Sequence, residues 1–446
     1  MTTIVRVKNV QVHNLKNVKQ GLFATNSTFE TLEEADIIGF YGQNGSGKTA
    51  IVEAFSLLKS LLSTSLYKSF LPKKSKNLLY AGEQHLKLSY EFLIVNDFGE
   101  FIAKYEVALK VVHERLQVVN EVLAYRENAK GKRFKELVSK HGETLKIRKL
   151  PTNKLNQDDR VTVLVANKLA LTNYTSFIFR EELKEVFEKH LDPSALAIIN
   201  NLGREFASDL HVIGNVQYGL LIANMIMPFS VHIKNKRGNI PTEMQDTLLM
   251  NKEAYQTIQE VIAQINIVLA SIIPGLEIKI NQINEQKLAN GEDGIRFEFL
   301  SKRGETQLPL HCESEGILKM ISILSTLIAV YNNPNTCVVI DELDAGVFEY
   351  LLGELLVVLS EGGKGQLFFT SHNLRILEVL PSSCIWFTTT NEDQRYIQLK
   401  GIKKLNNVRD VYLRAVQLGG QEEPLYEETS LFDIKRSFRK AGSQRE

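Results

Sequence analysis

Residues 42–49 have the types and spacing of a phosphate-binding loop. They read Gly-Gln-Asn-Gly-Ser-Gly-Lys-Thr, match G-x-x-x-x-G-K-[ST] at every fixed position, and lie between the apolar run IIGFY and a helical pattern. Glycines allow the backbone to curl so that several N–H groups face a phosphate, and the start of a helix adds favourable partial charge. Lys48 can reach the β- and γ-phosphates of a nucleotide, and the Thr49 hydroxyl can bind Mg²⁺. The predicted nucleotide-binding residues, unless the run is a chance glycine turn, are Gly42, Gln43, Asn44, Gly45, Ser46, Gly47, Lys48 and Thr49.

Two acids follow an apolar run farther along the chain. Residues 336–340 read TCVVI, as expected of a strand buried on both faces, and Asp341 and Glu342 come next. Ligands of open α/β sheets bind at the carboxyl ends of the strands. Asp341 is therefore suited to hold Mg²⁺, and Glu342 to polarise an attacking water. Alone, the two acids could equally be solvated residues that end a strand; with the loop they indicate nucleotide hydrolysis.

Two further sites have weaker signals. His372 follows the apolar run 366–370, where its imidazole can contact the γ-phosphate and sense its loss, although a lone histidine at a strand end can also be structural. Ser314 and Gly316 open the helix that precedes the acidic strand. Ser314 can cap that helix, and Gly316 lets a phosphate approach its N–H groups. The alternative is an ordinary N-cap with a glycine nearby.

Alternating strands and helices must position these residues. Such alternation predicts parallel strands joined by helical crossovers, hence an α/β fold. The expected strands are 37–41, 336–340 and 366–370, with edge strands at 384–389 and 396–399, and the expected helices are 49–62, 314–331 and 348–360. Residues 85–96, 101–113 and 116–126 predict an antiparallel β lobe beside the loop. Between them and residue 300 we expect helices at 181–190, 193–210 and 251–273 and strands at 276–283 and 294–300, without a long heptad run.

Bulk composition predicts a soluble cytoplasmic protein. Of 446 residues, 44% are hydrophobic and 24% charged, and the net charge of +1 points to no nucleic-acid or membrane partner. The three cysteines, Cys312, Cys337 and Cys384, lie far apart, which argues against a disulfide framework or a zinc site. The N-terminus does not resemble a signal peptide, and the longest apolar helical stretch, 320–331, is too short to cross a bilayer.

Three basic segments leave a DNA-binding role open. They are residues 68–76, 130–149 and 234–237. Such segments can bind phosphate backbones. The alternative is solvated loops, because acids such as Glu136 and Glu143 are interspersed.

The order of phosphate loop, serine–glycine signature, acidic strand and histidine resembles the ABC-type ATPase heads of the SMC, RecF and related families. Residues 41–55, YGQNGSGKTAIVEAF, look like the loop of SMC-like DNA-repair ATPases, and residues 341–346, DELDAG, resemble their acidic strand running into the D-loop. In size the chain is most similar to AAA-15/AAA-21 ATPases related to the overcoming-lysogenization-defect family, many of which serve bacterial antiviral defence. The resemblance implies a P-loop NTPase that binds ATP and Mg²⁺ as a homodimer. Ser314 and Gly316 would act in trans, and Asp344 would lie at the interface.

Three departures from that pattern matter. The signature reads Ser-Glu-Gly where the common motif has Ser-Gly-Gly. The loop that usually offers a glutamine to Mg²⁺ is not obvious: residues 177–182 resemble its approach but supply Arg180 and Glu181, and Gln84 is a remote candidate. The segment after His372 is too short for a Toprim nuclease domain, so we expect no nuclease in this chain.

The sequence thus predicts an ABC/SMC-head ATPase with a β lobe and a mixed, mainly helical insertion. The expected parts are 1–126 (loop and β lobe), 127–300 (insertion), 301–400 (signature, acidic strand and histidine) and 401–446 (a tail that could dock a partner). The leading hypothesis is an ATP-hydrolysing dimer that gates a separate effector, a nuclease or a toxin, in antiphage defence. The alternatives are a RecF-like ATPase that binds DNA directly and an ATP-bound scaffold with little turnover.

Overall fold

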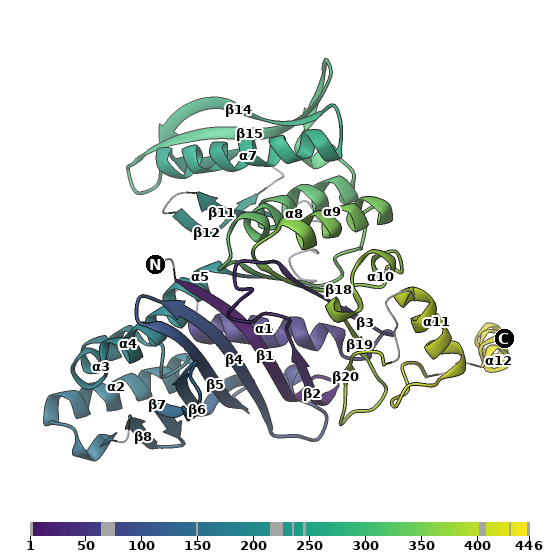
Figure 1. Cartoon of the computed structure of the whole chain (residues 1–446). Helices are drawn as coiled ribbons and strands as arrows, with labels where there is room; N and C mark the ends of the chain where they lie inside the picture. The colour runs from purple at the N-terminus through teal and green to yellow at the C-terminus, as the bar shows by residue number, and fades with distance from the viewer. Residues whose placement is uncertain are drawn as a thin grey trace.

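A six-stranded sheet in the order β10-β17-β18-β3-β19-β20 forms the centre of the molecule (Figure 1). The computed structural model describes residues 3–63, 76–148, 150–214, 226–233, 236–243, 247–400, 407–427 and 430–443. The strands are β3 (Asp36–Tyr41), β10 (Leu210–Ile213), β17 (Cys337–Ile340), β18 (Gln366–Thr370), β19 (Ile385–Thr388) and β20 (Tyr396–Ile397). Every pairing is parallel except that of β19 with β20. The predicted parallel sheet is confirmed, and its carboxyl ends share one edge.

Helices cover both faces of this sheet. Helix α1 (Lys48–Leu62) packs on one face, and α8 (Glu315–Asn332) and α9 (Glu349–Gly362) pack on the other. Alternate strand side chains point to the two faces, so that Phe368 joins the core of α1 while Phe369 joins the core of α8. The helices expected from the sequence at these places are confirmed to within two residues.

The length argument against a membrane helix is wrong for α8. This helix has 18 residues and is long and apolar enough to span a bilayer by length and composition. However, 67% of it is buried inside the protein, as expected of a core helix. Its apolar character follows from contact with the sheet on one side and with α7 (Lys252–Ile272) on another.

The antiparallel lobe has the order β2-β1-β4-β5-β6-β7-β8-β9. Its strands are β1 (Ile4–Leu15), β2 (Val18–Ala24), β4 (His85–Asn96), β5 (Gly99–Val112), β6 (Arg115–Glu127), β7 (Lys135–His141), β8 (Thr144–Ile147) and β9 (Leu150–Pro151). It shares one apolar core with α1, where Tyr90 donates a hydrogen bond from its hydroxyl to the Ala54 carbonyl at 2.7 Å. The predicted β lobe is confirmed, and it fixes α1 from the side opposite the central sheet.

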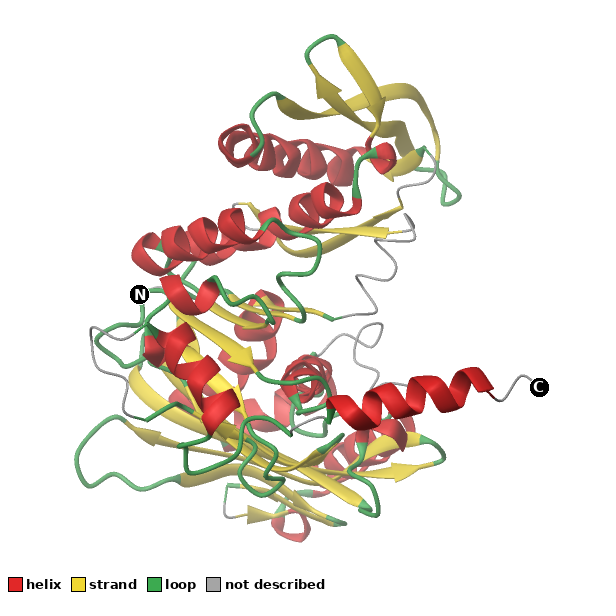
Figure 2. Ribbon diagram, turned by 90° about the vertical axis from the view of Figure 1, so that its right-hand side faces the viewer, coloured by secondary structure: helices red, strands yellow, loops and turns green. Residues whose placement is uncertain are grey.

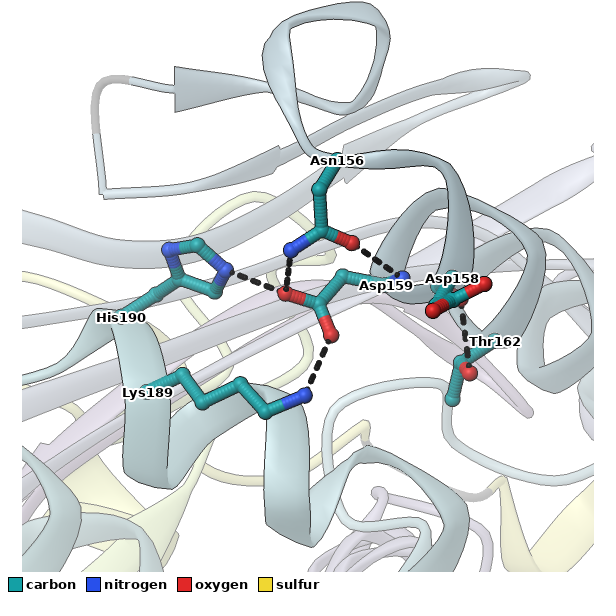
Figure 3. Close-up of polar contacts among 6 residues, drawn as sticks. All are labelled: Asn156, Asp158, Asp159, Thr162, Lys189 and His190. Carbon is teal, nitrogen blue, oxygen red and sulfur yellow. Dashed lines mark hydrogen bonds and ion pairs between the residues drawn. The ribbon is translucent and has the colours of Figure 1, made fainter.

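Short helices connect this lobe to β10. They are α2 (Gln157–Asn173), α3 (Lys184–His190), α4 (Pro193–Asn200), a π-helical turn (Asn201–Phe206) and α5 (Ala207–Asp209), with 3-10 turns at Thr152–Lys154 and Glu181–Leu183. Another 3-10 turn, Lys76–Leu78, lies between α1 and β4. Asp159 joins α2 to α3 (Figure 3). Its carboxylate accepts a hydrogen bond from Lys189 Nζ at 2.8 Å and lies 2.8 Å from His190 Nε2. These contacts, with a third from Asn156, lower the pKa of Asp159 to about 2.

A second, smaller layer packs against α8. It consists of α7 packed on β13 (Leu248–Asn251), β14 (Leu276–Lys287), β15 (Asp293–Arg303) and β16 (Thr306–Pro309), with the hairpin of β11 (Ile226–Ile233) and β12 (Lys236–Glu243) nearby. The remaining elements are 3-10 turns at Leu310–Cys312 and Ser382–Cys384 and the helices α10 (Ile376–Val379), α11 (Val408–Leu418) and α12 (Leu431–Ser443). Figure 2 shows α12 extending away from the rest of the chain.

Candidate active site

The phosphate loop connects β3 to α1 and depends on glycine at several positions. Gly45 and Gly47 have φ angles of 80° and 99°, in the left-handed region that favours glycine. A Cβ atom at Gly42 would lie 1.7 Å from Thr388 Oγ1. The glycines of the motif are therefore required by the backbone, and Gly47 caps the start of α1.

Side chains from outside the motif hold the loop. The contacts are Tyr396 Oη to the Gly47 carbonyl at 2.9 Å, Asn17 Nδ2 to the Gly45 carbonyl, and Ser46 Oγ with Thr388 Oγ1. They come from β20, from the β1–β2 turn and from β19. Sequence reasoning missed these residues, because nothing in their local patterns marks them. Two of these contacts hold the carbonyls of Gly45 and Gly47 and so fix the course of the loop backbone.

Lys48 is buried at the start of α1 and folds over the loop. Its Nζ donates hydrogen bonds to the Gly42 carbonyl at 2.7 Å and the Gln43 carbonyl at 2.9 Å. Burial lowers the pKa of Lys48 to about 8, and the nearby Asp341 and Glu342 oppose that shift. The lysine predicted to bind phosphate thus lies beside the predicted acids.

Asp341 ends β17 and is almost completely buried. Its Oδ1 accepts a hydrogen bond from Thr370 Oγ1 at 2.6 Å, whereas no hydrogen-bond partner for its buried Oδ2 occurs in the described ranges. An unpaired buried carboxylate oxygen is unfavourable unless a cation or a donor completes it. Carboxylate and hydroxyl oxygens suit Mg²⁺. Asp341, together with Thr49 in the first turn of α1, therefore fits the predicted metal ligands.

Glu342 has a backbone conformation that is uncommon for a residue with a side chain. Its φ angle is 48°, in the left-handed region. Its N–H donates to Thr370 Oγ1 at 2.7 Å, and its carbonyl accepts from Lys319 Nζ at 2.6 Å. The Glu342 side chain is exposed to solvent at the carboxyl edge of the sheet. An exposed carboxylate on a fixed backbone is available to a substrate water.

His372 lies beside the same acids. Its backbone N–H donates to Asp344 Oδ2 at 3.1 Å, which connects the segment after β18 to the segment after β17. Burial lowers the pKa of the His372 imidazole, and the charge on Lys48 lowers it further, against the opposite effect of the acids. The ring is therefore mostly neutral at pH 7 and can donate one hydrogen bond.

The signature residues begin α8. Ser314 occupies the N-cap position but makes no side-chain capping hydrogen bond, so the expected hydroxyl cap is not formed. A Cβ atom at Gly316 would lie 2.2 Å from the Gly346 carbonyl oxygen. Within one chain Gly316 therefore packs against the segment that follows Asp344, and the exposed Ser314 points to no partner of its own chain in the described contacts.

Lys319 is a second site residue that the sequence analysis missed. It lies on α8, is 6% exposed, and its charge interacts with those of Asp344, Glu342 and Asp341. Burial lowers the pKa of Lys319 to about 8 against the effect of these acids. A signal did exist, since a single lysine interrupts the otherwise apolar run GILKMISIL.

Two of the three candidates for the glutamine loop are engaged elsewhere, and the third, Gln84, is an exposed residue directly before β4. Arg180 donates to Thr175 Oγ1 at 3.0 Å and pairs with Glu182, and Glu181 pairs with Arg204. These contacts belong to the helices between β9 and β10. The carboxyl end of β10 is the part of this segment that reaches the site, where the Asp341 N–H donates to the Ile213 carbonyl at 2.9 Å.

The structure describes the side chains of only one of the three basic segments at length, the segment 130–149. Residues 68–75 lie outside the described ranges, as do residues 234–235 and the side chains at 236 and 237. In the segment 130–149, Lys132 pairs with Glu127, and Lys140 is buried opposite Glu121 on the neighbouring strand. DNA binding therefore gains no support from the segment that can be inspected.

A family model described as an AAA ATPase domain matches residues 6–377. No curated protein matches the sequence. An SMC head bound to the C-winged helix domain of ScpA superposes with a TM-score of 0.46 and 12% identity, over 88% of this chain and 97% of that chain. The SMC head domain from Thermotoga maritima gives 0.39 and 15%, over 89% and 100%, and the recombination mediator RecF with ATP gives 0.36 and 14%, over 83% and 94%. The matched range 6–377 includes every site residue that the sequence predicts.

Proposed function

The chain belongs to the AAA ATPase domain family, and from this premise we propose that it is an ABC-type ATPase that hydrolyses ATP with Mg²⁺. One observation carries the proposal. The buried Oδ2 of Asp341 has no hydrogen-bond partner among the described residues, and it lies at the edge of the sheet near Lys48. A carboxylate oxygen next to a phosphate-binding lysine suits an ion that bridges the protein and a nucleotide.

Each residue of the site has a separate proposed role in binding or catalysis. When bound, Mg²⁺ and ATP would supply an electrophilic phosphorus whose oxygens are partly neutralised by the ion. Lys48 and the N–H groups of residues 42–49 would hold the phosphates, and Thr49 and Asp341 would hold the ion. Glu342 would accept a proton from the attacking water, giving ADP and phosphate. His372 would donate a hydrogen bond to the phosphate that leaves.

The proposal includes a homodimer closed around ATP. Ser314 and Gly316 of one copy would contact the nucleotide of the other, with Asp344 at the interface. Two observations support this arrangement: the side chain of Ser314 is exposed, and the large aromatic side chains of Phe348 and Tyr350, shortly after Asp344, are 69% and 52% exposed. Exposed aromatic residues are enriched at protein interfaces.

The biological output would pass through a separate effector, a nuclease or a toxin, in bacterial antiphage defence within the cytoplasm. The sequence resemblance supports this step. The division into 1–126, 127–300, 301–400 and 401–446 belongs to the same proposal, with the tail as the docking segment.

The test is the mass of Glu342→Gln in solution with and without Mg-ATP, measured by light scattering. We expect ATP-dependent dimerisation, loss of turnover and retention of bound ATP, because the amide cannot accept the proton. Lys48→Ala is the matched control and should neither bind ATP nor dimerise. Wild-type turnover by Glu342→Gln would exclude Glu342 as the base. A mass that stays the same when Mg-ATP is added would favour the scaffold alternative. DNA binding that is stimulated by ATP and depends on salt would favour the RecF-like alternative.

A further inference from the structure

Lys319 is a charged residue at a buried position that would suit an apolar side chain. It lies in the first third of α8, between the buried residues Leu318 and Met320, and only 6% of it is exposed. Burying an ammonium group is costly unless it is hydrogen-bonded and paired with opposite charge. An apolar residue would pack at this position at lower cost, so the charge itself is the feature to be explained.

The ammonium group is directed at the backbone of Glu342. Lys319 Nζ donates to the Glu342 carbonyl at 2.6 Å, and the same carbonyl accepts from the Ala345 N–H at 3.0 Å. On the other side of the residue, the Glu342 N–H donates to Thr370 Oγ1 at 2.7 Å. Hydrogen bonds therefore fix both peptide groups that flank the Glu342 side chain.

This fixation matters because Glu342 has a left-handed backbone with a φ angle of 48°. Such a conformation is unfavourable for a residue with a Cβ atom and persists only when its surroundings determine it. Relaxation to an ordinary conformation would turn the side chain away from the edge of the sheet. A general base depends on its position, and a displacement of about 1 Å can cost about 100-fold in rate.

We propose that Lys319 is a positioning residue that holds the Glu342 backbone in its left-handed conformation and connects it to the start of α8. Ser314 and Lys319 are five residues apart on one rigid helix, about 7.5 Å along its axis at 1.5 Å per residue. A shift of the signature end of α8 is therefore transmitted to the carbonyl of Glu342. The inference rests on the proposed role of Glu342 as the general base.

Two substitutions separate charge from shape. Lys319→Met keeps most of the apolar stem and removes the donor, whereas Lys319→Arg keeps a donor. Lys287→Met, at an exposed lysine paired with Asp293 on β14, is the matched control. Each variant is first checked for cooperative unfolding and for ATP binding, which should change by less than about 3-fold because the proposed role of Lys319 is to hold the Glu342 backbone.

The first readout needs no nucleotide. Hydrogen exchange of residues 341–347 should be faster in Lys319→Met than in the wild type by about 10-fold, unchanged in the control, and partly restored by arginine. The second readout is turnover, for which we expect kcat of Lys319→Met to fall roughly 10- to 100-fold with little change in KM.

Wild-type exchange in residues 341–347 of Lys319→Met would overturn the inference, as would wild-type kcat. Failure of the proposed function has a different signature. In that case the wild type itself would hydrolyse no ATP and Glu342→Gln would trap none, while the exchange experiment would still decide whether Lys319 holds this backbone.

Discussion

Thr370 connects the two acids of the site, and its replacement gives a sharp test of the geometry. The side chain is 1% exposed, donates to Asp341 Oδ1 at 2.6 Å and accepts from the Glu342 N–H at 2.7 Å. Valine has nearly the same shape but neither donates nor accepts. Thr370→Val therefore removes two hydrogen bonds, one of which is the hydrogen bond that the buried Asp341 carboxylate accepts from Thr370.

The expected loss of unfolding free energy follows from the two hydrogen bonds that Thr370 makes. A hydrogen bond to a charged group contributes about 1.5–3 kcal/mol and one between neutral groups about 1 kcal/mol. We therefore expect Thr370→Val to lower the free energy of unfolding by about 2–4 kcal/mol. Thr370→Ser is the matched control, because it keeps the hydroxyl and loses one methyl group, at a cost of about 1 kcal/mol.

The assay is urea denaturation without nucleotide, followed by turnover of ATP. Valine should be clearly more destabilising than serine, and turnover should fall in the valine variant, since both the proposed metal ligand and the proposed base lose a partner. If serine destabilises the protein as much as valine, packing of the methyl group decides the stability. The hydrogen-bonded bridge between the acids would then be refuted.

Two further predictions concern other parts of the chain. Gly316→Ala should destabilise the protein by about 1–3 kcal/mol and weaken ATP-dependent dimerisation, because its Cβ would lie 2.2 Å from the Gly346 carbonyl. Gly353→Ala, whose Cβ would meet its nearest neighbour at an ordinary 3.6 Å, should be tolerated, and equal unfolding midpoints for the two variants would contradict the clash. The pKa of Asp159 is lowered from 3.8 to about 2 by Lys189 and its neighbours, so its stabilisation is present above about pH 4 and is lost as the pH falls towards 2. The difference in unfolding free energy between the wild type and Asp159→Asn should shrink over that range, and a difference independent of pH would show that the shift is absent.

The elements of the ATPase core could be predicted because their signals are local. The phosphate loop is a contiguous run with a fixed spacing, and strands buried on both faces read as short apolar runs before a polar residue. Between β9 and β10 the helical segments 181–190 and 193–209 follow their expected ranges, although Asn201–Phe206 is a π-helical turn that no pattern marks, whereas α2 (Gln157–Asn173) was not predicted. Local sequence patterns are sufficient to predict a helix or strand when that element packs against one face of a neighbouring element.

The contacts between elements could not be predicted, because they depend on the order of strands in the sheet. Thr370 reaches both acids only because β18 lies between β3 and β17, an order that the sequence does not state. Asn17 and Tyr396 meet at the phosphate loop from opposite ends of the chain. The sheet that contains β14 and β15 packs on α7, and no nucleotide-binding motif in the sequence indicates this packing.

The position of β18 has a consequence for how the site senses its ligand. The strand ends in Thr370, which touches both acids, and two residues later His372 binds Asp344 through its backbone. The same acids interact with Lys48 from α1 and Lys319 from α8. A change in charge at the phosphate loop therefore acts on one hydrogen-bonded cluster that includes the start of the D-loop and the signature helix. Because α8 is rigid and buried, the cluster can move the exposed start of α8 only as a unit, as the proposed switch between open and closed dimers would require.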